Sequence, residues 1–74
     1  MAEWRAIYKC RLCGEIFEDG VTGEGNACAI NVALSVNETF YNSNTHSSGH
    51  RYVPHFCEDG SFGFADFQGF RMVE

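Results

Sequence analysis

Two short stretches near opposite ends of the sequence constrain this chain more than any other feature. The first is CRLCG, which starts at Cys10 and carries a second thiol at Cys13. The second is HFCEDG, which starts at His55 and carries Cys57 two positions later. Cysteine and histidine are ligands that zinc prefers, and a structural zinc site takes four of them in a tetrahedron. We therefore predict that one Zn²⁺ ion joins the two stretches and is held by Cys10, Cys13, His55 and Cys57.

Local geometry supports this ligand set. In CRLCG, Gly14 follows the second thiol, as it does in turns that wrap a metal and need a positive φ at that position. In HFCEDG, His55 and Cys57 stand at i and i+2 of an extended segment, so both side chains point to the same side. Four protein ligands leave no open position for a reacting water. The predicted ion is therefore structural, and we expect the protein not to be an enzyme.

The fourth ligand has rivals in the sequence. His50 could replace His55, and Cys28 would make a site of four cysteines. His46 lies in a polar stretch and is the weakest of the histidine candidates. A simpler interpretation of Cys28 is a small apolar residue in a buried run, because free cysteine behaves as a small hydrophobe. The sequence leaves these alternatives open.

Length and charge narrow the class of protein. Seventy-four residues predict a single domain spanning 1–74, and a core of that size usually needs a metal, disulfides or a partner to hold it. The first residues lack the apolar stretch of a signal peptide, which predicts a cytoplasmic protein with reduced thiols. No window has the length of a membrane span. The net charge of −5 disfavours a nucleic-acid partner because the phosphate backbone is itself negative.

Alternation of apolar and polar residues predicts a β-rich fold. It indicates a strand at 4–10, a short return strand at 15–17 and a last strand from about 61 to 66. Residues 27–36 fit either a strand or one short helix, and five apolar residues at every second position favour the strand slightly. Small polar residues predict a mobile loop at about 39–51. The expected fold class is a small, metal-stabilised, β-rich domain.

The motifs resemble two known groups of proteins. Two cysteine-bearing turns that hold short strands resemble a zinc ribbon, although a second complete CxxC is absent here. The pair CxxCG and His-x-Cys-x-Asp-Gly-x-x-Gly-x-Ala is similar to a small bacterial and phage-associated family of uncharacterised function, over about 30 of the 74 residues. The resemblance implies a zinc-binding, β-rich domain and carries no implication of an activity.

The aromatic residues outside the predicted metal site give the predicted function. Four phenylalanines gather near the C-terminus, at positions 62, 64, 67 and 70; they build the core or, where they are exposed, bind a partner. We predict a zinc-binding mini-domain that acts as an adaptor for another protein, with a homo-oligomer as one form of that partnership. A nucleic-acid-binding zinc ribbon is the alternative, because aromatic side chains also stack on bases beside basic residues. A CxxC thiol redox protein is a third candidate, but the chain after Cys13 turns too soon for the helix that such a site needs.

Overall fold

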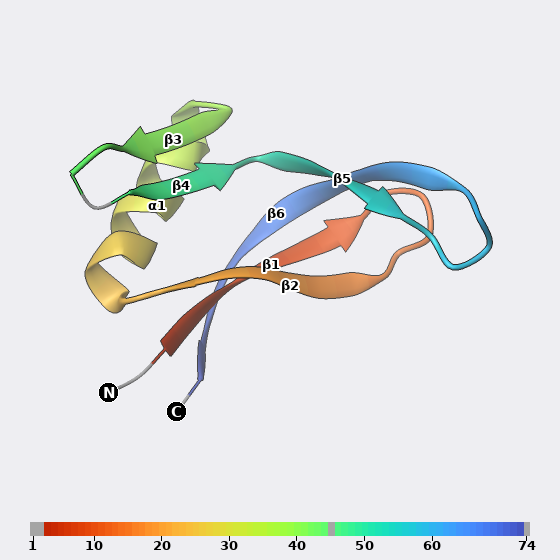
Figure 1. The fold of residues 1–74 in the computed structure, drawn as a ribbon, viewed down its shortest axis with the longest axis horizontal. Helices are drawn as coiled ribbons and strands as arrows, with labels where there is room; N and C mark the ends of the chain where they lie inside the picture. The colour runs from red at the N-terminus through yellow and green to blue at the C-terminus, as the bar shows by residue number, and fades with distance from the viewer. Residues whose placement is uncertain (1–2, 45, 74) are drawn as a thin grey trace.

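A computed structural model describes residues 3–44 and 46–73 as six strands and one helix. In chain order the elements are β1 (Glu3–Cys10), β2 (Ile16–Thr22), α1 (Glu24–Val36), β3 (Thr39–Asn42), β4 (Ser47–His50), β5 (Tyr52–Phe56) and β6 (Phe62–Val73). Four strands form an antiparallel sheet in the order β2-β1-β6-β5, and β3 pairs with β4 in a separate hairpin. The helix and this hairpin lie together at one end of the sheet (Figure 1). The protein is a small β-rich domain with one short helix.

The core lies on one face of the four-stranded sheet, which we call the inner face. Ala6, Tyr8 and Cys10 alternate along β1 and are buried there together with Cys57 and Ala65. The partly buried hydrophobic residues packed around them are Phe17, Val53, Phe67 and Phe70. Alternation of side chains is a property of any strand, so the strand predicted at 4–10 is confirmed by β1 with nearly the same bounds.

Two strands are longer than the sequence predicted. β2 continues beyond residue 17, where the predicted return strand ended, into a glycine-rich stretch. It does so through a β-bulge, since two steps along β1, from Arg5 to Ile7, match three steps along β2, from Val21 to Glu18. An extra residue of this kind bends a strand without ending it. β6 has a second bulge opposite Ile7 and extends well past its predicted end at residue 66.

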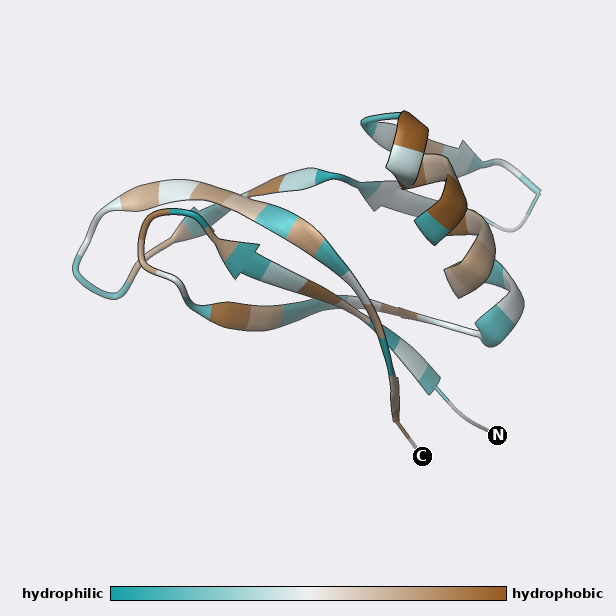
Figure 2. Cartoon of the chain, turned by 180° about the vertical axis from the view of Figure 1, so that it is seen from behind, coloured by the Kyte–Doolittle hydropathy of each residue, from teal (hydrophilic) through white to brown (hydrophobic). Residues whose placement is uncertain are grey.

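The segment 27–36 is helical, and our preference for a strand was wrong. It belongs to α1, whose buried residues Ala27, Ile30 and Leu34 follow helical spacing on one face. Figure 2 shows hydrophobic residues at several places along the helix. They are frequent enough that every second position in the sequence is also apolar, which is the pattern of a strand. Of the five residues that alternation would have buried together, Ile30 and Leu34 are buried, but Cys28, Val32 and Val36 are exposed. Packing decided the outcome, because α1 places its narrow buried face against the β3–β4 hairpin.

That hairpin occupies most of the segment 39–51, where we expected a loop. β3 and β4 pair in register from Thr39 with His50 to Asn42 with Ser47. The hairpin supports α1 through Gly49, since a Cβ there would lie 2.7 Å from Cγ2 of Ile30. Glycine is needed at this position for the close approach of hairpin and helix.

Three hydrogen bonds from two side chains tie the helix and the β3–β4 hairpin to the sheet. The Tyr8 hydroxyl, on β1, donates to the carbonyl oxygen of His50 at 2.8 Å. The Arg51 guanidinium, between β4 and β5, donates to the carbonyl oxygen of Leu34 at 2.7 and 3.0 Å. A cleft of about 440 Å³ separates the sheet from the helix and hairpin. Its lining includes Tyr8, Phe67 and Phe70 on the sheet side and Ile30 and Leu34 on the helix side.

Candidate metal centre

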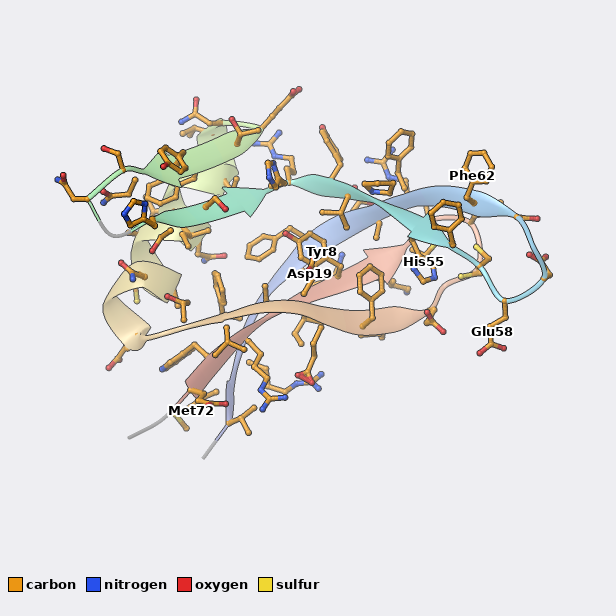
Figure 3. The ribbon with its side chains drawn as sticks, in the orientation of Figure 1. Tyr8, Asp19, His55, Glu58, Phe62 and Met72 are labelled. Carbon is orange, nitrogen blue, oxygen red and sulfur yellow. The ribbon has the colours of Figure 1, made fainter. Side chains whose placement is uncertain are left out.

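The four residues predicted as metal ligands lie together at the end of the sheet opposite the helix. Cys10 is the last residue of β1, and Cys13 lies in the turn that follows. His55 lies in β5, and Cys57 comes directly after that strand. One donor atom from each residue can be chosen so that all four lie within 4.8 Å of one another. Figure 3 shows the ring of His55 beside the sulfur atoms, which are drawn in yellow.

Small residues on β6 allow the side chains of β1 and β5 to meet. β6 lies between these two strands, with Ala65 opposite Cys10 on one side and Gly63 opposite His55 on the other. Ala65 is completely buried, and a Cβ at Gly63 would lie 2.9 Å from Cβ of Leu12 and 3.8 Å from Sγ of Cys10. Larger residues here would fill the space in which the donor atoms meet. We did not predict this role, although the alternation of small residues in Gly-x-Ala was visible in the sequence.

Two similar turns present the sulfur atoms. After β1, the amide of Gly14 donates to the carbonyl oxygen of Cys10 at 3.0 Å, and Gly14 has a φ of 78°. After β5, the amide of Gly60 donates to the carbonyl oxygen of Cys57 at 3.2 Å, and Gly60 has a φ of 94°. Both φ values lie in the region that favours glycine. The positive φ predicted at Gly14 is therefore confirmed.

The electrostatics of the sulfur atoms differ. The backbone amide of Cys13 lowers the pKa of the Cys10 thiol below its ordinary value, because it donates a hydrogen bond to the thiolate. Burial raises the pKa of the Cys57 thiol, and the neighbouring sulfur atoms of Cys13 and Cys10 raise it further. Sγ of Cys10 and Sγ of Cys57 are 3.9 Å apart. Several thiolates so close together repel one another, and a bound cation would remove that repulsion and deprotonate the thiols.

His55 has a buried nitrogen that fits a metal. Its ring stacks on Phe17, with centroids 4.7 Å apart and an angle of 15° between the planes. Nε2 is buried and lies 3.0 Å from a carboxylate oxygen of Glu15, yet it makes no hydrogen bond to any described residue. A buried polar atom without a partner is costly and calls for an explanation. A metal ion bound to Nε2 would supply one.

The rival ligands lie elsewhere. Cys28 is exposed on α1, and His50 ends β4 at the helix end of the molecule. His46 lies in the turn between β3 and β4 and lines the cleft. Among residues 3–44 and 46–73, the group of metal-binding side chains is the Cys₃His set of the prediction. This set could hold a metal ion, and its four donors match the number that a tetrahedral site requires.

Comparisons with known proteins return no relatives: no family model, no curated protein and no solved structure matches the chain. The resemblance to the bacterial and phage-associated family therefore stays a prediction. The described part of the chain contains no helix with the length and apolar character that crossing a membrane requires.

Proposed function

We propose that the Cys₃His cluster binds one Zn²⁺ ion and that this ion is structural. The observation that carries the proposal is the grouping of three sulfur donors and one imidazole within 4.8 Å. Thiolate ligands select zinc over magnesium, calcium and manganese, which prefer oxygen. Two glycine turns that present sulfur toward one ion make the arrangement zinc-ribbon-like. Three thiolates also need a reducing compartment, which supports a cytoplasmic location.

A filled coordination sphere supports a binding role and argues against catalysis. A catalytic zinc keeps a position open for water or substrate, whereas this cluster offers four protein donors. In this proposal the protein is a non-enzymatic adaptor, and the ion holds the β5–β6 hairpin in the shape that a protein partner recognises. The large exposed side chains of that hairpin, Phe56, Phe62 and Phe64, support such a role.

Metal analysis of the purified protein and of two pairs of variants tests the proposal. We expect one zinc per chain in the wild type, and loss of that zinc in Cys57→Ser and in His55→Ala. The matched controls Cys28→Ser and His50→Ala change the same residue types outside the cluster and should retain a full equivalent. Zinc should also dissociate as the pH falls, because protons compete with the metal for the thiolates. A wild type that binds no zinc, or a Cys28→Ser variant that loses it, would contradict the assignment.

Nucleic acid is a second candidate partner, and one observation favours it. Four of the five basic residues of the chain lie on β1, β6 or the adjoining turn, where alternation directs them to the face opposite the core: Arg5, Lys9, Arg11 and Arg71. Two of them are already paired, Arg5 with Glu3 and Glu18, and Arg11 with Asp66. A fluorescence titration with single-stranded DNA tests this candidate. Affinity that falls steeply with salt supports a nucleic-acid partner, and absence of binding at low salt contradicts it.

A further inference from the structure

A strip of five exposed side chains covers the outer face of the β5–β6 hairpin. Its members, which we call the aromatic strip, are Tyr52, Pro54, Phe56, Phe62 and Phe64. The strand register makes them neighbours, since Phe56 pairs with Phe62 and Pro54 with Phe64. The rings of Phe56 and Phe62 lie 5.6 Å apart between centroids. In Figure 3, Phe62 projects from one side of the hairpin and His55 from the other. The strip and the metal centre therefore lie on opposite faces of the hairpin.

The aromatic strip exposes a large apolar area to solvent. Phe56, Phe62 and Phe64 are 78%, 70% and 60% exposed. Five side chains of this size expose on the order of 600 Å², given the area that an aromatic residue can bury. That area approaches the roughly 800 Å² that each partner buries in a stable interface. The helix and the β3–β4 hairpin of the same chain lie at the opposite end of the sheet and leave the strip uncovered (Figure 1).

The charges at the two ends of the strip are opposite in sign. The β5–β6 turn carries Asp59 at one end of the strip, whereas Glu58 of the same turn projects away from Phe62 in Figure 3, so that end contributes −1. At the other end Lys9 and Arg11 stand against Asp66, which leaves +1. Arg11 lies over the ring of Tyr52, 5.2 Å from its centroid, and so adjoins the strip directly. A surface with an apolar centre and oppositely charged ends is complementary to a copy of itself turned by 180°.

We propose that the aromatic strip is the interface of a homodimer. Two copies pack strip against strip about a twofold axis, and Asp59 of each copy lies close to Lys9 and Arg11 of the partner subunit. Pro54 on the edge strand β5 disfavours the alternative of edge-to-edge pairing, because proline has no amide to donate. The acidic end of the strip disfavours a nucleic acid as occupant, since it would repel the phosphates. The proposal rests on the proposed function and names its partner: the protein that the zinc-held hairpin recognises is a second copy of this chain.

Molecular mass in solution tests the dimer. Sedimentation equilibrium of the zinc-loaded protein, from micromolar to millimolar concentration, should give twice the 8.3 kDa of one chain. Phe62→Ser should weaken dimerisation by about 30-fold or more, as expected for a large aromatic residue that is buried in an interface. Val36→Ser is the matched control, because Val36 is 77% exposed at the helix end and should leave the dimer unchanged. Zinc content is measured for every variant, so loss of the dimer and loss of the metal are told apart.

Charge reversal tests the twofold arrangement independently of the apolar contact. Lys9→Glu and Asp59→Lys should each weaken the dimer by about tenfold, because each places like charges together at both ends of the interface. The two reversals combined should restore most of the affinity, since opposite charges then meet again. A wild type that stays monomeric at millimolar concentration with its zinc bound overturns the proposal. So does a strip that, in the monomer, binds single-stranded DNA or an unrelated protein and loses that binding in Phe62→Ser.

Discussion

The two ends of the molecule bury their hydrophobic residues in different ways. At the end that carries the metal centre, which we call the metal end, Cys10 and Cys57 belong to one cluster of buried residues with Ala65. At the end formed by α1, β3 and β4, which we call the helix end, Ile30 and Leu34 pack on the hairpin, outside that cluster. A cleft of about 440 Å³ separates them from the sheet. The buried cluster of the sheet therefore includes two of the residues that we propose to bind an ion, Cys10 and Cys57, whereas the helix end has no such ligands among the described residues.

Removal of the metal should give the largest effect and break the comparison most directly. We expect a strong chelator, or Cys57→Ser, to unfold both ends, because zinc supplies on the order of 10 kcal/mol in domains of this size. The helix should melt as well, since a helix of 13 residues is marginal without packing. Far-ultraviolet circular dichroism with parallel zinc analysis measures this. A spectrum unchanged after proven loss of zinc would contradict the proposed role of the ion.

A core substitution at the helix end should act locally. Leu34→Ala removes a buried side chain from α1 and should cost about 2–3 kcal/mol of unfolding free energy, at the low end of such changes because the neighbouring cleft lets the site relax. Zinc should remain bound. Chemical denaturation measures the loss of unfolding free energy. Amide hydrogen exchange should become faster in α1 of the variant than in the wild type and change less in β1. If zinc affinity falls as far as stability does, the two ends are not separable.

Two glycines provide a matched test of the same comparison. Gly63→Ala places a methyl group 2.9 Å from Cβ of Leu12, beside the metal centre, whereas Gly49→Ala places one 2.7 Å from Cγ2 of Ile30 at the helix end. Each overpacked site should cost about 1–3 kcal/mol. Zinc affinity, measured by competition with a chromophoric chelator, should fall in Gly63→Ala and stay unchanged in Gly49→Ala. Equal zinc affinities in the two variants would refute the role assigned to Gly63.

The smallest effect is expected at the contact between the two ends. Tyr8→Phe removes the hydroxyl that donates to the carbonyl oxygen of His50 and should cost about 1 kcal/mol. Burial raises the pKa of Tyr8 above its ordinary value of 10.0. The folded state therefore holds this proton more tightly, so its contribution is complete below pH 10 and is lost as the pH rises above that value.

Denaturation curves from pH 8 upward measure the contribution of Tyr8. The wild type should lose stability more steeply above pH 10 than Tyr8→Phe does, and the difference between the two proteins should shrink. Parallel curves for the two proteins would show that the hydroxyl does not couple the ends.

The sequence specified the candidate site more fully than the fold. Cys10, Cys13, His55 and Cys57 were predicted from spacing alone, and the structure brings them together, because two glycine turns and an i, i+2 pair fix local geometry that depends little on the rest of the chain. The rivals Cys28 and His50 stayed open in the sequence because spacing along the chain does not reveal which ends of the strands meet.

What tertiary structure alone decided lies mainly at the helix end. Residues 27–36 have a hydrophobic pattern that satisfies two periods, and only the presence of β3 and β4 as a packing surface selected the helix. The sequence likewise did not predict that β6 lies between β1 and β5. This order places the small residues Gly63 and Ala65 beneath the four donors. Local turns are set by residues a few positions apart. The choice between helix and strand, and the order of strands in a sheet, depend on contacts between residues distant in the chain, which no short motif encodes.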